Sequence, residues 1–156
     1  MKISINANRC EPSPMRKFHP LAVQAKKEGK QIFHLNIGQP DLQTPEAFYD
    51  ALRNFQDATL AYEASPGMPM LIDAVREYYR DLGVELEPND VLITTGGSEA
   101  LLFTCLSILD PYTEVIIPEP YYPNYTTFVH AAGGVIRALP TNPWEGYRYA
   151  QRDRIE

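Results

Sequence analysis

The chain has 156 residues, the length of one ordinary domain with a hydrophobic core of its own. Its composition, with 44% hydrophobic and 22% charged residues, is typical of a soluble globular protein, and its net charge of −6 argues against nucleic acid as the main partner. No apolar run approaches the ~20 residues of a membrane span, and the N-terminus lacks the apolar core of a signal peptide. We therefore expect a cytoplasmic protein that makes no membrane contact.

The first 45 residues are predicted to hold little regular structure beyond one helix. Residues 1–17 are polar and contain prolines, which indicates an arm or an extended lead-in. A helix is predicted over 18–29 and ends at Gly29. Residues 31–37 are a short strand candidate, and the turn at 38–41 follows them.

Two further helices are predicted before the middle of the chain. Pro45 fits a helix start, and apolar residues at helical spacing predict a helix over 46–55. Residues 57–70 show no steady period and indicate a structured loop. Residues 70–82 are the clearest helix, because their apolar side chains fall on one face. Residues 88–90 are predicted to form a turn.

A glycine turn then joins a strand to a helix. Residues 91–95 are an apolar, β-branched run that predicts a strand, and Gly96 and Gly97 interrupt it. Ser98 is the expected N-cap, and the apolar residues after Ala100 recur at helical spacing. Free amides, the positive end of the helix dipole and two glycines make this turn a candidate phosphate site. A tight connection without a ligand is the open alternative.

The last part of the chain predicts a parallel sheet. Strands are expected over 114–118 and 135–139, with a helix over 121–132 between them and Gly133 and Gly134 at its end. With the strand at 91–95, this gives a right-handed βαβαβ run. The predicted fold class is α/β, a three-layer αβα arrangement with a mainly parallel sheet.

Ligands of such sheets bind at the carboxyl ends of the strands. That edge carries residues 96–98 after one strand and residues 119–122, with two adjacent tyrosines, after the next. A phosphorylated ligand with a flat ring would satisfy both segments.

Four motifs in order give the chain a family resemblance. The chain resembles the N-terminal part of a class I/II aminotransferase, a pyridoxal 5'-phosphate enzyme of fold type I in the aspartate aminotransferase group. The resemblance implies an arm and small-domain segment over 1–40 and an incomplete cofactor-binding large domain over 41–156. The four motifs are Leu35–Asp41, Tyr62 with Ser65-Pro66-Gly67, Gly96–Leu101 and Glu119–Tyr125.

The resemblance implies that Gly96, Gly97 and Ser98 hold the cofactor phosphate. It implies that Tyr122 stacks on the cofactor ring, whereas the alternative role is that of a core tyrosine.

It further implies that Tyr62 reaches the phosphate of a partner subunit in a homodimer, and that Gly38 lies beside the substrate carboxylate. A buried loop aromatic and a plain turn glycine are the alternatives for these two positions.

The chain lacks the parts that carry out the reaction in this family. The family's Schiff-base lysine, its pyridine-binding carboxylate and its substrate-binding arginine lie downstream of the resembling region, and no residue after Lys30 is a lysine. We therefore predict no catalytic residue and no turnover in the chain alone. The cysteines, Cys10 and Cys105, are far apart and predict reduced thiols rather than a metal site, and the three histidines are taken as structural or surface groups.

The predicted function is the N-terminal portion of an aminotransferase that moves an amino group from an amino acid to a 2-oxo acid. A lyase or synthase of the same fold is one alternative, because these motifs do not fix the reaction type. A non-catalytic module that binds a phosphate ligand or a protein partner is the other. The resemblance also implies that the strand at 91–95 does not lie beside the strand at 114–118.

Overall fold

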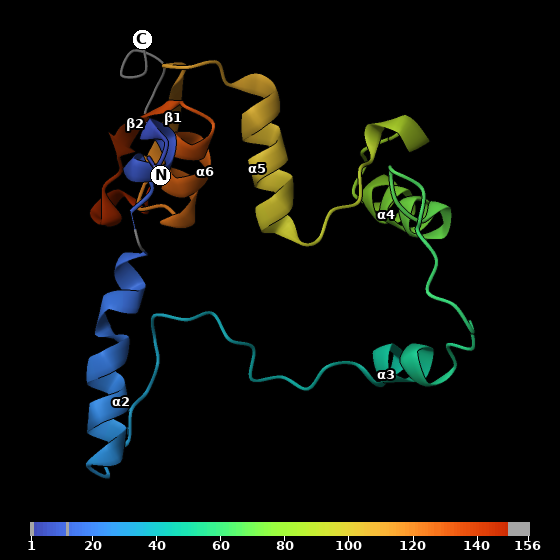
Figure 1. Cartoon of the computed structure of the whole chain (residues 1–156), viewed down its shortest axis with the longest axis horizontal. Helices are drawn as coiled ribbons and strands as arrows, with labels where there is room; N and C mark the ends of the chain where they lie inside the picture. Colours follow the sequence, from blue (N-terminus) through green and yellow to red (C-terminus); the bar gives the residue numbers. More distant parts are fainter. Residues whose placement is uncertain (1, 12, 150–156) are drawn as a thin grey trace. The chain divides into compact units, whose positions relative to one another are not determined.

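A computed structural model describes residues 2–11 and 13–149, and it divides the chain into two compact units. One unit is Phe18–Ile93. The other combines Met1–Lys17 with Thr94–Glu156. Figure 1 shows the two units in the colours of the sequence.

The Phe18–Ile93 unit is built from helices at the predicted places. It contains α2 (His19–Lys27), α3 (Glu46–Arg53), α4 (Pro69–Asp81) and a 3-10 turn, η2 (Pro88–Asp90). The predictions of three helices and of a turn at 88–90 are therefore confirmed. Ile72 of α4, 7% exposed, is the one buried hydrophobic residue among the described residues of this unit.

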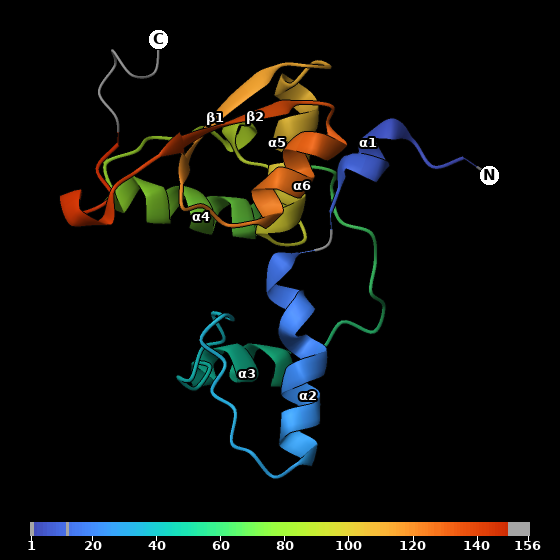
Figure 2. The ribbon, with the colours of Figure 1, turned by 90° about the vertical axis from the view of Figure 1, so that its left-hand side faces the viewer.

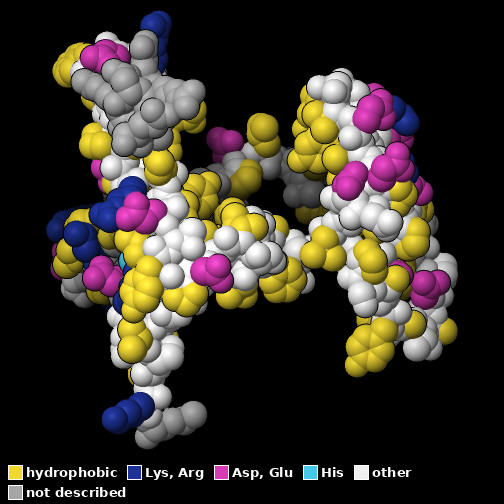
Figure 3. Space-filling model, turned by 90° about the horizontal axis from the view of Figure 1, so that it is seen from above, with side chains coloured by type: hydrophobic (Ala, Val, Ile, Leu, Met, Phe, Trp, Pro, Cys, Tyr) yellow, Lys and Arg dark blue, Asp and Glu magenta, His cyan; other side chains and the backbone are white. Residues whose placement is uncertain are grey.

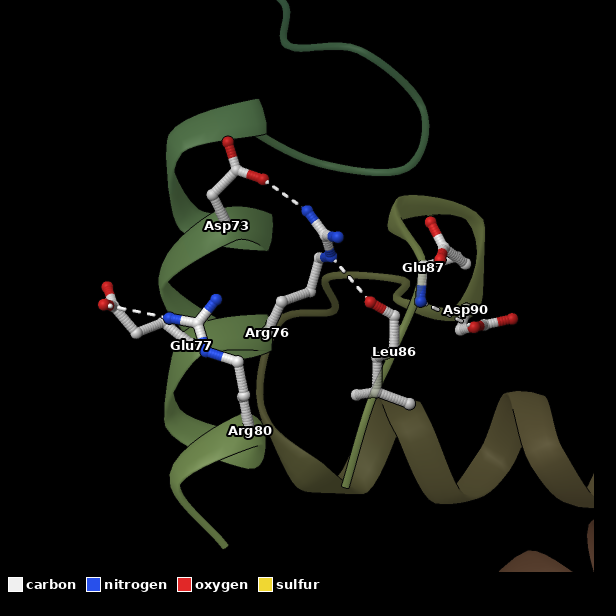
Figure 4. Close-up of polar contacts among 7 residues, drawn as sticks. All are labelled: Asp73, Arg76, Glu77, Arg80, Leu86, Glu87 and Asp90. Atoms are coloured by element: carbon white, nitrogen blue, oxygen red, sulfur yellow. Dashed lines mark hydrogen bonds and ion pairs between the residues drawn. The ribbon is translucent and has the colours of Figure 1, made fainter. Parts of the chain in front are cut away.

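Arg76 fastens α4 to the segment that follows it. Its Nε donates a hydrogen bond to the Leu86 carbonyl at 2.8 Å, and its Nη1 lies 3.0 Å from Oδ1 of Asp73 (Figure 4). Asp90 closes η2 by accepting the amide of Glu87 at 2.8 Å. One guanidinium therefore satisfies a loop carbonyl and a helix carboxylate together.

The prediction of a strand over 31–37 is wrong. The described backbone there has no ladder partner, and it turns at residues 35–36. A strand needs a neighbour to accept its amides, so an apolar run alone does not make one.

The prediction of a strand over 91–95 is also wrong for the same reason. Val91 has strand-like angles, with φ −119° and ψ 123°, yet residues 91–95 pair with no strand in the described ranges. The amide of Ile93 instead donates to the Pro66 carbonyl at 2.9 Å. Gly67, at φ +114°, lies so close that an added Cβ would be 2.5 Å from the Ile93 Cβ, so this contact requires glycine.

The second unit contains the parallel sheet. Strand β1 (Glu114–Glu119) pairs with β2 (Val135–Pro140) in parallel, with Glu114 opposite Val135 and Glu119 opposite Pro140. Helix α6 (Asn124–Ala131) connects them (Figure 2). The prediction of a strand, helix and parallel strand over 114–139 is confirmed. The unit also contains helix α5 (Gly97–Ile108) and the 3-10 turn η3 (Pro143–Glu145).

The predicted N-terminal arm is anchored to the end of α6. It forms a short helix, α1 (Ile5–Arg9), and a 3-10 turn, η1 (Pro14–Phe18). Nδ2 of Asn6 donates to the Ala131 carbonyl at 3.3 Å, and Nη2 of Arg9 donates to the Gly134 carbonyl at 2.8 Å. The first bond satisfies a carbonyl of the last turn of α6, which has no intrahelical partner, and the second satisfies a carbonyl in the segment that leads from α6 to β2.

Val129, 3% exposed, is the centre of this unit's small core. Gly134 packs against it so closely that an added Cβ would lie 2.9 Å from Val129 Cγ1 and 3.3 Å from the Thr113 carbonyl oxygen. Most other large hydrophobic residues in the described ranges are at least partly exposed, and Figure 3 shows hydrophobic side chains spread over the surface. None of the described helices is long and apolar enough to cross a membrane.

Replacing Gly134 with Ala is expected to lower the free energy of unfolding by about 1–3 kcal/mol. The new methyl group would press on Val129 and on the backbone carbonyl of Thr113, which cannot move aside as a flexible side chain could. Urea unfolding followed by circular dichroism measures the change. Gly38→Ala is the matched control, since a Cβ there meets no atom within 4 Å. Equal stability of the Gly134 variant and the parent would contradict the close packing.

An ion pair across the two strands is expected to make stability depend on pH. Arg137 donates to the Glu114 carboxylate, and this hydrogen bond holds the pKa of Glu114 below its usual value. A lowered folded-state pKa gives stability that is present above the unfolded pKa of about 4.3 and is lost as pH falls through the folded value. Arg137→Gln should therefore remove part of the loss of stability between neutral and acid pH. Urea midpoints measured at pH 7 and near pH 3 test this, and parallel curves for both proteins would refute it.

Candidate functional site

The glycine turn opens helix α5. Gly96, at φ +84° and ψ 170°, is the N-cap, and no side chain caps the helix. The prediction of Ser98 as the N-cap is therefore wrong, because the left-handed turn at Gly96 starts the helix one residue after it, at Gly97. Ser98 is the second helical residue.

The backbone at this turn is open. A Cβ added to Gly96 or Gly97 would meet no atom within 4 Å. The first amides of a helix have no intrahelical acceptor, and they lie at the positive end of the helix dipole. The turn can therefore donate several hydrogen bonds to an anion that approaches along the helix axis.

Glu99 folds back over the start of the helix. Its Oε2 accepts the amide of Thr95 at 2.5 Å, and the Thr94 hydroxyl donates to the Gly96 carbonyl at 3.1 Å. The Glu99 side chain therefore does not point away from the turn. Its carboxylate accepts the Thr95 amide beside the turn, and its negative charge would repel an anion bound there.

Cys105 lies on the same helix and is half-buried. Burial raises the pKa of the Cys105 thiol, which lowers the fraction of thiolate at neutral pH. Cys10 is also a free thiol. Among the described residues there is no group of histidine, cysteine, aspartate and glutamate that could hold a metal ion.

Tyr122 lies between the end of β1 and the start of α6. Its hydroxyl accepts a hydrogen bond from Nδ2 of Asn124 at 2.8 Å, and its ring meets Tyr125 edge-on at 5.6 Å. The side chain is 48% exposed, so one part of the ring is free to contact another molecule.

Tyr122 lines a cavity of about 550 Å³ at the carboxyl ends of the strands. Among the described residues of its lining, Glu119, which precedes a cis proline, is the one that carries a charge. Tyrosines form much of the wall, so the cavity suits a flat ring. The aromatic lining residues are Tyr121, Tyr122, Tyr125, Tyr147 and Tyr149.

A second cavity, of about 650 Å³, lies between the N-terminal arm and the ends of both strands. Glu11 and Ser13 come from the arm, and Thr141 follows β2. Ser13 Oγ is buried and has no partner in the described part of the chain. Sequence reasoning missed this cavity, because only the docking of the arm on α6 brings Glu11 and Ser13 to the sheet edge.

The predicted site residues are only partly gathered in space. Residues 96–98 and Tyr122 belong to the same unit, yet residues 96–98 line neither cavity. Tyr62 and Gly38 belong to the Phe18–Ile93 unit. Tyr62 is fully exposed, and a Cβ on Gly38 would meet nothing within 4 Å.

Comparison with known proteins places this arrangement in a family. The family described as "Aminotransferase class I and II" matches residues 30–151. Aspartate/prephenate aminotransferase of Thermus thermophilus is 32% identical over 147 residues, which cover 93% of this chain and 38% of that protein. The chain thus spans about two fifths of the length of such relatives.

Solved structures agree with the sequence match. An aspartate aminotransferase of Thermus thermophilus gives a TM-score of 0.86 at 31% identity, covering 99% of this chain and 41% of the other. Alanine aminotransferase of Pyrococcus furiosus gives 0.83 at 32% identity, covering 96% and 39%. The fold is thus part of the αβα domain of these enzymes. With most of its length matched by one family and by structures of that family, the chain belongs to the class I and II aminotransferases.

Proposed function

We propose that this chain supplies the phosphate-binding turn and the ring-stacking tyrosine of a pyridoxal-phosphate aminotransferase. The observation that carries the proposal is the open, uncapped start of α5 at Gly96 and Gly97. Its amides and its dipole favour a phosphate dianion. Ser98 adds a hydroxyl at the second helical position, where it can donate to the same phosphate.

The half-exposed ring of Tyr122 supports the second role. Asn124 and Tyr125 hold it at the edge of a tyrosine-lined cavity, so stacking on a bound ring requires no unpacking of a core. Stacking of this kind orients the cofactor and contributes binding free energy. Pyridoxal phosphate, when bound, supplies the electron-withdrawing ring on which amino-group transfer depends.

The proposed reaction is the transfer of an amino group from an amino acid to a 2-oxo acid. Relatives named as aspartate/prephenate and alanine aminotransferases support this class of substrate. No lysine follows Lys30, so we propose that the described chain binds and orients but does not itself carry the Schiff base. A lyase or synthase of the same fold would use the same two features.

The remaining roles are proposals of the same kind. Tyr62, fully exposed, would reach the phosphate of a partner subunit in a homodimer, and Gly38 would leave room for the substrate carboxylate. Residues 1–40 would form an arm and small-domain segment, and residues 41–156 part of the large domain. A cytoplasmic location fits the two free cysteines.

Pyridoxine 5'-phosphate tests the turn, because it lacks the aldehyde that would react with surface lysines. We expect the chain to bind it more tightly than pyridoxine, and Gly97→Val to raise the dissociation constant about tenfold or more, since a branched side chain blocks the approach to the helix amides. Isothermal titration measures both. Gly38→Val is the matched control, as its surroundings are equally open. Equal affinity for the two ligands, or an unchanged constant in the Gly97 variant, would refute the phosphate role.

Replacing Tyr122 with Ala is expected to weaken binding of the same ligand by ~0.5–1.5 kcal/mol beyond the lost contact area, because the stacking contact disappears. Tyr78→Ala, an exposed tyrosine on α4, serves as the control. If both variants bind equally well, Tyr122 has no stacking role.

A further inference from the structure

Tyr122 is held by the start of helix α6 at both its backbone and its hydroxyl group. Its carbonyl accepts the amide of Tyr125 at 3.0 Å, and Nδ2 of Asn124 donates to its hydroxyl at 2.8 Å. The Thr126 amide donates to the Pro123 carbonyl at 3.2 Å, so the backbone between the two contacts is fixed as well. A hydrogen bond between side chains two residues apart on an ordered backbone closes no flexible loop, and little entropy opposes it.

The two contacts of the Tyr122 side chain restrain different torsions. The hydroxyl oxygen of a tyrosine lies on the long axis of the ring, so the bond from Asn124 fixes the direction of that axis and leaves rotation about it free. The ring of Tyr125 meets that of Tyr122 at a centroid distance of 5.6 Å and an interplanar angle of 85°, and this edge contact restrains the rotation. Asn124 thus determines where the ring lies, and Tyr125 determines how its plane is turned.

The side chain of Asn124 does not cap its own helix. Asparagine is favoured at the N-cap, where its side-chain oxygen accepts an amide of the first turn. Asn124 is instead the first residue of α6, the N-cap is Pro123, and no side chain caps the helix. Among the described residues, the hydrogen bond of the Asn124 side chain goes to Tyr122. The side chain therefore acts on the ring and not on the helix.

This restraint is important because the ring is half-exposed. Tyr122 is 48% exposed and lines the cavity of about 550 Å³ at the carboxyl ends of the strands, whereas Asn124 is half-buried. A mobile aromatic side chain loses rotamer freedom when a ligand orders it, and this loss lowers the affinity. A ring that is fixed in the free protein has already lost that freedom on folding.

We propose that Asn124 is a positioning residue for ring stacking, which fixes the axis of the Tyr122 ring before a ligand binds. The proposal rests on the proposed function, in which Tyr122 stacks on the ring of the cofactor. Asn124 acts through the Tyr122 hydroxyl and not through contact with the cofactor. A phenylalanine at position 122 would stack as well, but it would offer no acceptor to Asn124.

Pyridoxine 5'-phosphate is achiral, so its absorption band gains circular dichroism only when the protein holds its ring in one orientation. The strength of this band at saturation therefore reports orientation separately from affinity. Asn124→Leu keeps the branched shape of asparagine but cannot donate. In this variant we expect the band per bound molecule to fall by about half or more and the dissociation constant to rise about two- to fivefold.

Tyr122→Phe removes the same hydrogen bond from its other side and should produce the same loss. Because it leaves the start of α6 untouched, the outcome does not depend on the stability of the helix in Asn124→Leu. The double variant should lose no more than either single variant, since both changes remove one interaction.

Two further variants are controls. In Asn124→Asp the Tyr122 hydroxyl can donate to the new carboxylate, so the band per bound molecule should be kept, although the added charge weakens affinity for a phosphate. Asn89→Leu changes an exposed asparagine of η2 in the other unit, and it should leave both the band and the dissociation constant unchanged.

An unchanged band in Asn124→Leu, when the parent chain binds the ligand, overturns the positioning role and leaves the stacking role of Tyr122 intact. Additive losses in the double variant also overturn it, because Asn124 would then act on something other than the Tyr122 hydroxyl. A loss in Asn124→Asp as large as in Asn124→Leu has the same consequence. A parent chain that does not bind pyridoxine 5'-phosphate refutes the proposed function, and the positioning role with it.

Discussion

The structure of the second unit depends on the close approach of Gly134 to Val129. With no side chain at Gly134, the chain leaves α6 and enters β2 against both Val129 and the Thr113 carbonyl. Directly after Gly134, the Val135 amide donates to the Thr113 carbonyl at 2.9 Å, where the parallel pairing of β1 and β2 begins. The carboxyl ends of both strands then meet at one edge, which is why Tyr122 and the two cavities lie there. The candidate site at the carboxyl ends of the strands thus depends on the packing of Gly134 against Val129 at their amino ends.

The parts that sequence reasoning found are the parts whose stabilising contacts are local. Helices α3 and α4 follow from apolar spacing, and β1 and β2 pair across a single helix. The segments at 31–37 and 91–95 carry strand-like residues as well, yet their ladder partners do not lie among the described segments, and propensity alone does not make a strand. The prediction of Ser98 as the N-cap was wrong for a different reason. Ser98 has the right chemistry, but the positive φ that glycine allows at Gly96 determines where the helix begins.

The candidate site also has parts that the sequence predicted and a part that it did not. Motifs and their order pointed to the turn at 96–98 and to Tyr122, because each motif is a short continuous stretch. The cavity between the N-terminal arm and the strand ends could not be predicted from motifs. Its residues Ser13 and Thr141 are brought together by the bonds that Asn6 and Arg9 make at the end of α6. Such bonds join backbone carbonyls to side chains far away in sequence, and no local pattern marks them.

Glu99 bonds beside the same turn that is proposed to hold a phosphate. Its carboxylate lies in the first turn of α5, where negative charge is favoured, and it accepts the amide of Thr95, the residue before the N-cap. A phosphate would be attracted to the same positive end of the helix, and it has a larger charge and more acceptor oxygens than a carboxylate. The carboxylate and a phosphate at the same turn would repel each other. If the turn holds a phosphate as proposed, its affinity would reflect the favourable contact with the helix amides less the repulsion from Glu99, whose bond to Thr95 also orders the turn.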